Sequence, residues 1–215
     1  GGLFQWKEML PWLEHHLKGK TLENPPGLYA FTMGENDWHH YEEWPGPIAK
    51  QTLSLNKLLA SPGCDGGELA LEQGLSEPVS YQYDPLDPVP TKGGAGMLAF
   101  ILPNFEGASP ANVLQDGLCE RQDVLTFVTS RLESSMLIAG KISVNLEVSS
   151  SAPDTSFTAK LIEVFADGSA VNIRDNITSL AYRDGGFNPR EYTPGESITL
   201  KIDMWPIEWR VSEEI

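Results

Sequence analysis

The chain has 215 residues, among them 30 acidic and 15 basic residues, for a formal net charge of −15. This length is enough for one domain with a full hydrophobic core. The excess of negative charge disfavours nucleic acids and anionic membranes as partners, because both are recognised through clustered Lys and Arg. No apolar run approaches the roughly 20 residues of a membrane span, so we expect no membrane partner.

Apolar residues near the N-terminus recur at steps of three and four, which predicts a helix. Pro11 lacks a backbone N–H, so we expect this helix to begin near Pro11 and to stop at Gly19. Residues 27–33 then predict a strand. Residues 34–44 are mostly polar and predict a loop with aromatic anchors.

From about residue 50 onward the pattern is almost wholly that of short strands separated by Gly and Pro. The clearest strands are 142–148 and 198–204, where apolar and polar residues alternate. A change of phase within 157–164 predicts a bulge, and Asp167-Gly168 predicts a type I′ hairpin turn. Shorter strands are expected at 51–55, 68–72, 79–83 and 123–129. Together these elements predict an all-β sandwich or jelly roll.

The two cysteines, Cys64 and Cys119, are too few for a disulfide framework and are not in C-x-x-C spacing. We expect two buried or free thiols in a reducing cytosol rather than one bridge. No signal peptide is visible at the start of the sequence, so the expected location is the cytoplasm. The sequence itself leaves the pairing of these cysteines open.

The most informative segment is Tyr81–Gly94, which reads Y-Q-Y-D-P-L-D-P-V-P-T-K-G-G. Its three prolines fix φ and lack an N–H, so the segment can be neither helix nor central strand. Gly93 and Gly94 allow the backbone to turn sharply or to approach another surface closely. The segment therefore predicts a rigid connection of one geometry.

This run resembles the C-terminal β-sandwich of cocaine-esterase-like (CocE/NonD) hydrolases and X-Pro dipeptidyl-peptidases. Further blocks resemble the same family in the same order and extend the similarity over essentially the whole chain. These blocks are 17–19, 29–38, 44–45, 121–125, 149–161, 164–168, 182–183 and 194–196.

The resemblance implies a jelly-roll (galactose-binding-like) β-sandwich over residues 27–215. Residues 1–26 would be a short helix and linker left over from the hydrolase domain. Ser156 and Asn176 depart from the family pattern, where Asp and Gly are usual. Nothing here matches the closing strands that follow the block at 202–209 in the family, so we expect the sandwich to lack its last strands. An open sheet edge would then be available to another chain.

Catalytic residues are not expected within this chain. No G-x-S-x-G nucleophile elbow occurs, and in the nearest approach, Gly74–Pro78, proline replaces the second glycine. All four histidines lie in the first forty residues, at His15, His16, His39 and His40, and none is paired by spacing with a plausible serine. The resemblance implies that the family's Ser-His-Asp triad would precede Gly1, and it implies no cofactor.

Two other kinds of site were weighed. His39, His40 and Glu43 could present two ligands on one helical turn, fewer than the three or four that a zinc site needs. Asp84 and Asp87 precede prolines and are better turn formers than calcium ligands. We therefore expect no metal site. A sugar-binding platform could use Tyr81, Tyr83, Trp205 and Trp209, although packing is the expected role of most large aromatic residues.

In the resembled enzymes, the loop after the two glycines faces the catalytic groove. That implies a role for Met97, Leu98 and Phe100 as apolar wall residues, with ordinary core packing as the alternative.

The expected function is an accessory sandwich that braces a serine hydrolase of esters or amides. Its partner would be the α/β-hydrolase domain of the same protein, with a homo-oligomer as a further expectation. The alternatives are a free-standing carbohydrate-binding module and an interaction fragment completed by a partner chain.

Overall fold

Strands make up most of the regular structure of this chain. The computed structural model describes residues 6–22, 27–56, 64, 66–74, 77–94 and 111–213. In chain order the elements are helix α1 (Trp6–Lys18), strands β1 (Leu28–Thr32), β2 (Asp37–Tyr41), β3 (Ser54–Asn56) and β4 (Gly67–Ala70), the short 3₁₀ helix η1 (Leu118–Glu120), and strands β5 (Phe127–Val128), β6 (Met136–Val148), β7 (Ser156–Val164), β8 (Ala170–Ser179) and β9 (Ile198–Val211). The expectation of an all-β sandwich with a short N-terminal helix is confirmed.

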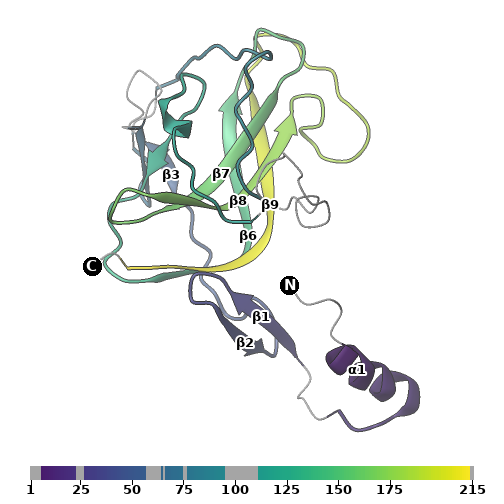
Figure 1. Cartoon of the computed structure of the whole chain (residues 1–215). Coiled ribbons are helices and arrows are strands. Elements are labelled where there is room, and N and C mark those ends of the chain that lie inside the picture. Colours follow the sequence, from purple (N-terminus) through teal and green to yellow (C-terminus); the bar gives the residue numbers. More distant parts are fainter. Residues whose placement is uncertain are drawn as a thin grey trace.

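Two long antiparallel pairs, β6–β9 and β7–β8, form the main body (Figure 1). β8 also packs against β9: the Arg174 guanidinium donates to the carbonyls of Trp205 and Pro206, and the Asn176 amide donates to the carbonyl of Asp203. The shorter strands β3, β4 and β5 form a separate sheet beside this body.

The hydrophobic core contains Ile173 of β8 together with Ile207 and Trp209 of β9. Further along β9, Leu200 and Ile202 are fully buried, whereas the residues between the buried positions are exposed. The alternation in 142–148 and 198–204 thus marks one face toward the core and one toward solvent, as the period of two predicts. Burial of these aliphatic side chains supplies the main stabilising term of the sandwich.

The predicted bulge is confirmed, because the β7–β8 register shifts between Leu161 and Ile162. The hairpin at Asp167-Gly168 also exists, but its turn type differs from the prediction. Only Gly168 has a positive φ, of 83°, and its N–H donates to the Phe165 carbonyl at 2.8 Å. The connection is therefore a type I turn followed by a left-handed glycine, whereas a type I′ turn needs positive φ at both positions.

Helix α1 begins earlier than expected and contains Pro11 within it. Proline costs this helix the one hydrogen bond that its missing N–H would have donated, and the first turn before it is still helical. The expected stop at Gly19 is confirmed: this glycine has φ 67°, and its N–H donates to the His15 carbonyl. No helix in the described ranges is both long and apolar enough to cross a membrane.

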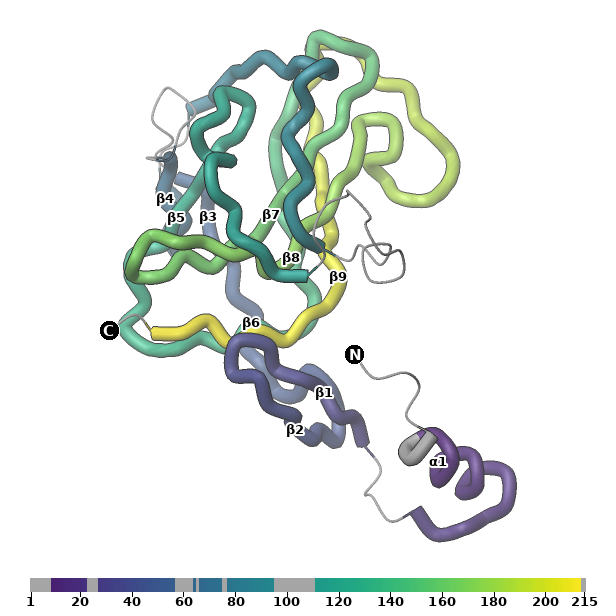
Figure 2. The backbone as a smooth tube through the Cα atoms, in the orientation of Figure 1, coloured from purple at the N-terminus to yellow at the C-terminus, as the bar shows by residue number. Residues whose placement is uncertain are grey.

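Two expectations for non-helical segments were wrong. Residues 37–41 form strand β2, which pairs with β1 as a hairpin below the sandwich (Figure 2). The hairpin forms because Gly34 and Asn36 both adopt positive φ, and the Asn36 N–H donates to the Thr32 carbonyl at 2.8 Å. Residues 79–83, in contrast, form no strand and have no regular secondary structure.

Cys64 and Cys119 form a disulfide, so the expectation of two free thiols was wrong. The bridge spans 55 residues of sequence and joins the segment before β4 to η1. Spacing in the sequence could not reveal this pairing, because only the fold brings the two segments together.

Candidate functional site

The segment Tyr81–Gly94 lies along the sandwich and begins with a tight turn. The Asp84 carboxylate accepts a hydrogen bond from the Leu86 N–H at 2.9 Å, and its carbonyl accepts one from the Asp87 N–H at 3.1 Å. An aspartate side chain that bonds the backbone two residues ahead stabilises the turn by itself. Asp84 is therefore a turn former, as its position before a proline predicts.

Asp87 and Asp123 meet at one arginine. The Arg121 guanidinium donates to both carboxylate oxygens of Asp87 at 3.2 Å and to its carbonyl at 2.6 Å. It also donates to the two carboxylate oxygens of Asp123 at 2.7 and 2.9 Å. These hydrogen bonds hold the pKa of Asp123 below its ordinary value. The planar fork of arginine thus connects the proline-rich segment to the segment before β5.

The end of the proline-rich segment is packed too closely for any side chain at Gly93. A Cβ atom there would lie 2.5 Å from the Ala111 carbonyl oxygen and 2.7 Å from Oδ1 of Asn172. Asn172, on β8, is buried, and its Oδ1 accepts from the Val113 N–H at 2.8 Å and from the Gln115 amide at 3.1 Å. A glycine with φ 78° is what this close approach requires.

Lys160 of β7 completes the network from the other side. Its ammonium group donates to Oε1 of Gln115 at 2.9 Å and to the Lys92 carbonyl at 3.3 Å, and it lies 3.8 Å from the Asp175 carboxylate. Burial lowers the pKa of Lys160 despite the attraction of Asp175. The lysine therefore fixes the backbone of the proline-rich segment onto the β7–β8 pair.

Gly94 and Ala111, the described residues on either side of 95–110, are paired with each other. The Gly94 N–H donates to the Ala111 carbonyl at 3.0 Å, and the Ala111 N–H donates to the Gly94 carbonyl at 2.8 Å. Met97, Leu98 and Phe100, the expected groove-wall residues, lie outside the described residues. What the structure shows is that the described residues flanking this segment, Gly94 and Ala111, are joined by two backbone hydrogen bonds.

A second polar cluster lies where the hairpin meets β9. The buried carboxylate of Glu208 accepts hydrogen bonds from the hydroxyl of Thr32, from that of Tyr41 at 2.7 Å and from the Trp44 indole at 2.5 Å. Burial alone would raise the pKa of Glu208, but these three hydrogen bonds outweigh it and lower the pKa. Burial and the hydrogen bond to Glu208 raise the pKa of Tyr41. The Arg210–Glu35 ion pair, at 2.6 Å, lies beside this cluster.

A third cluster fixes the end of β9. Oε2 of Glu163, a buried residue of β7, accepts from the Trp209 indole at 2.8 Å, and Oε1 accepts from the Ser212 N–H at 2.9 Å. Because a buried carboxylate must be paired or hydrogen bonded, both Glu163 and Glu208 serve to hold elements together. Glu163 also accepts a hydrogen bond from the Ser212 hydroxyl at 3.1 Å, which fixes the residue just after β9 as well.

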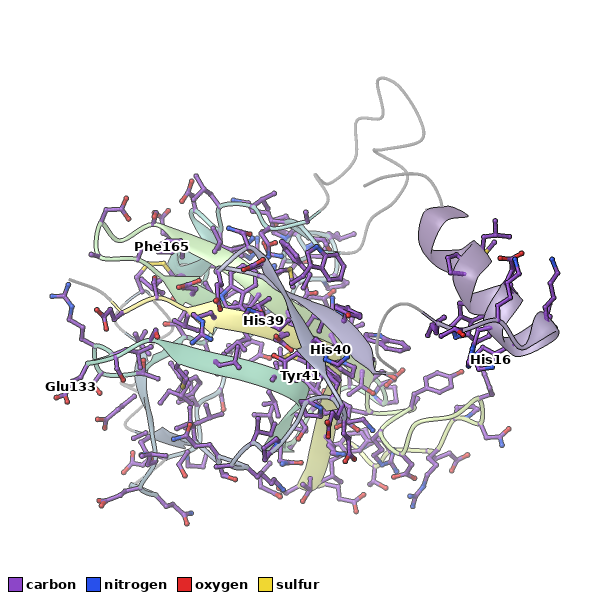
Figure 3. The ribbon with its side chains drawn as sticks, turned by 90° about the horizontal axis from the view of Figure 1, so that it is seen from below. His16, His39, His40, Tyr41, Glu133 and Phe165 are labelled. Atoms are coloured by element: carbon purple, nitrogen blue, oxygen red, sulfur yellow. A yellow bond between two sulfur atoms is a disulfide. The ribbon has the colours of Figure 1, made fainter. Side chains whose placement is uncertain are left out.

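The histidines are divided between two elements. His15 and His16 are on α1, whereas His39 and His40 are neighbours on β2, where successive side chains point to opposite faces (Figure 3). The reading of His39, His40 and Glu43 as one helical turn was therefore wrong. Within the described ranges no histidine is hydrogen bonded to a serine, and no group of three or more His, Cys, Asp or Glu side chains could hold a metal ion.

The aromatic residues weighed as a sugar platform do not share one exposed surface. Trp209 is only 5% exposed and is part of the core, whereas Trp205 is 71% exposed. Tyr81 and Tyr83 are partly exposed on the proline-rich segment. Burial raises the pKa of Tyr81, with a further contribution from the charge of Asp123. Packing is thus the role of Trp209, and the geometry gives no support to a Trp205–Trp209 platform.

Residues 20–213 match the family described as the X-Pro dipeptidyl-peptidase C-terminal non-catalytic domain. The chain belongs to this family. The match covers the hairpin, both long strand pairs and the whole of β9, so the family's sandwich includes every polar cluster described above. The resemblance inferred from the proline-rich segment is confirmed.

A cocaine esterase of Rhodococcus sp. (strain MB1 Bresler) is 36% identical over 196 residues, which are 89% of this chain and 33% of that protein. Among solved structures, an α-amino acid ester hydrolase has a TM-score of 0.70 and 22% identity over 95% of this chain and 35% of that chain. An aminopeptidase from a marine sediment Thaumarchaeota archaeon has a TM-score of 0.69 and 20% identity, over 97% and 35%. The two structures agree on the fold, and the chain spans about a third of each of these three proteins.

Sequence reasoning did not find the roles of Arg121 and Glu208. A signal for Arg121 was present, because residues 121–125 and the proline-rich segment both carry the family resemblance, and Arg121 is opposite in charge to Asp87. Glu208 had only a weak signal, as a carboxylate set among apolar residues of a strand. Its partners are more than 160 residues away in sequence, so only the tertiary structure reveals them.

Proposed function

We propose that this chain is the accessory sandwich of a longer serine hydrolase that acts on esters or amides. In this proposal residues 27–215 brace an α/β-hydrolase domain of the same polypeptide, and residues 1–26 are the end of that domain and a linker. The observation that carries the proposal is the family match over residues 20–213, together with 36% identity to a third of a cocaine esterase.

We further propose that Met97, Leu98 and Phe100 form an apolar wall of the substrate groove. The anchored base of their loop supports this role, because the Gly94–Ala111 pair and the Asn172 network fix the points where the loop starts and ends. Sites built on fixed supports hold their geometry better than sites on unsupported loops.

A homo-oligomer stays a prediction. So does the cytoplasmic location, and the Cys64–Cys119 disulfide argues against it by favouring an oxidising compartment.

The test compares the 215-residue chain with the full-length polypeptide. We expect the chain alone to hydrolyse neither p-nitrophenyl esters nor X-Pro anilides above buffer, and the full-length polypeptide to hydrolyse one class. Turnover by the chain alone that titrates with a serine-directed phosphonate would refute the non-catalytic role.

The groove wall is tested in the full-length polypeptide with Leu98→Ala and Phe100→Ala. Each substitution removes apolar contacts that are equally strong in the ground state and in the transition state. We therefore expect KM to rise by roughly tenfold for each large side chain and kcat to stay nearly unchanged. The matched control is Leu86→Ala, at an almost fully exposed leucine of the proline-rich segment. Equal KM values for all variants would exclude the wall.

A further inference from the structure

The β1–β2 hairpin has two faces of different character. On one face, Thr32 and Tyr41 donate to Glu208 and attach the hairpin to β9. The opposite face carries two directly paired rows, Tyr29 with His40 and Phe31 with Trp38. We call these four residues the aromatic ladder. Because side chains alternate along a strand, attachment of one face to the sandwich leaves the ladder facing outward.

The ladder is organised but uncovered. The rings of Tyr29 and His40 are 4.8 Å apart and those of Phe31 and Trp38 are 5.4 Å apart, distances typical of interacting aromatic pairs. Trp38 is 63% exposed, Tyr29 47% and Phe31 38%. The chain has a net charge of −15, yet the ladder is a contiguous patch of aromatic side chains. Depletion of charged residues and enrichment of aromatic residues are typical of the core of a protein interface.

A hollow of about 520 Å³ adjoins the end of the ladder. It is lined by His40, Tyr41, Glu42, Glu43, Gly46 and Pro47. Glu42 and Glu43 are exposed, so the hollow carries negative charge and lies next to the apolar rings of the ladder. A partner surface that fits both features is apolar, with a Lys or Arg side chain at its margin.

Helix α1 exposes a second apolar surface. Leu10, Trp12 and Leu17 are all largely exposed, and the helix stands apart from the sandwich, at the end where the hairpin projects (Figures 1 and 2). A helix of 13 residues is marginal in water without tertiary packing. Because the proposed function assigns residues 1–26 to the end of the hydrolase domain, the rest of that domain would cover the exposed face of α1. The aromatic ladder lies at the same end of the molecule.

We propose that the aromatic ladder is the surface on which the catalytic part of the same polypeptide docks, with the adjoining hollow receiving a basic side chain of that part. This inference rests on the proposed function. The occupant follows from the length of the relatives, since the chain accounts for only about a third of each, and from the position of the ladder at the N-terminal side of the sandwich.

The experiment places the photo-crosslinking residue p-benzoylphenylalanine at Trp38 in the full-length polypeptide. This substitution keeps a large ring in the ladder, so the hairpin retains its cross-strand pair. The matched control carries the same residue at Trp205 of β9, which is 71% exposed against 63% for Trp38. We expect intramolecular crosslinks from position 38 to the catalytic part and none from position 205. Crosslinks to a second copy, crosslinks equal at both positions, or no crosslink from position 38 would overturn the inference.

A second measurement uses the paired variants Trp38→Ser and Trp38→Phe, with Trp205→Ser as control. We expect Trp38→Ser to shorten the half-life of hydrolase activity at elevated temperature by about tenfold or more, the size typical of truncating a buried aromatic anchor. Trp38→Phe should restore most of the half-life, and Trp205→Ser should not change it. Absence of phosphonate labelling in the full-length polypeptide would refute the proposed function, whereas labelling with no effect of Trp38→Ser would refute the docking surface alone.

Discussion

The interior of the sandwich and its junction with the hairpin are held together by different forces. In the interior, aliphatic residues of β6, β8 and β9 exclude water, and no specific partner is needed for any one of them. At the junction, the carboxylate of Glu208 receives three hydrogen bonds from residues on and after the hairpin. An apolar side chain can pack against many different apolar neighbours. A buried carboxylate, in contrast, needs hydrogen-bond donors at specific positions.

The polar junction attaches one face of the hairpin to β9 and leaves the opposite face of the hairpin uncovered. A polar junction fixes orientation, because hydrogen bonds are directional. The aromatic ladder is thereby held at a defined angle outside the sandwich. An interior made only of apolar contacts would specify that angle less strictly.

The largest effect is expected inside the sandwich. Leu200 is fully buried and lies opposite Leu146 in the β6–β9 register. Leu200→Ala should lower the free energy of unfolding by about 4 kcal/mol, because it removes apolar contacts and leaves a cavity. Urea denaturation measures this loss, with Leu86→Ala at an exposed position as the control. A loss equal to that of the control would mean that this strand pair is not the core.

The covalent tie should have the next largest effect. Replacing both cysteines, Cys64→Ser with Cys119→Ser, opens a loop of 55 residues and should lower the free energy of unfolding by about 3 kcal/mol. Reductant should destabilise the wild type by a similar amount and leave the double variant unchanged. Two free thiols in unreduced, denatured protein would contradict the bridge.

At the hairpin junction a smaller loss is expected. Glu208→Ala leaves the hydroxyls of Thr32 and Tyr41 without their acceptor and should cost about 2 kcal/mol. Glu147, an exposed glutamate of β6, provides the matched control Glu147→Ala. Protease cleavage within residues 28–41 should accelerate in Glu208→Ala only. Unchanged cleavage would show that the carboxylate does not hold the hairpin.

The smallest effect concerns pH. Since the pKa of Glu208 is lowered in the folded chain from the ordinary 4.5, its contribution is present above that pH and is lost as the pH falls through the folded value. Hairpin cleavage by an acid-active protease should therefore increase below about pH 4.5 in the wild type. In Glu208→Gln, which cannot ionise, that increase should be reduced. Identical pH profiles would exclude Glu208 as the titrating group.

Several features could be predicted from the sequence because their causes are local. Alternation at 142–148 and 198–204 marks which side chains enter the core, and the phase change within 157–164 marks the bulge. The proline-rich segment excludes regular structure and carries the family resemblance. The strand alternation, the bulge and the proline-rich connection each depend on one short segment, where the backbone alone imposes the period or the turn.

Only the tertiary structure decided the partners of the charged and polar residues. The polar composition of 34–44 predicted a loop, yet Gly34 and Asn36 allow a turn, and pairing with β1 makes 37–41 a strand. The Cys64–Cys119 bridge and the donors around Glu208 join positions far apart in sequence. A hydrogen bond or a disulfide needs two groups at a fixed distance, and that distance exists only after the apolar core has brought the segments together.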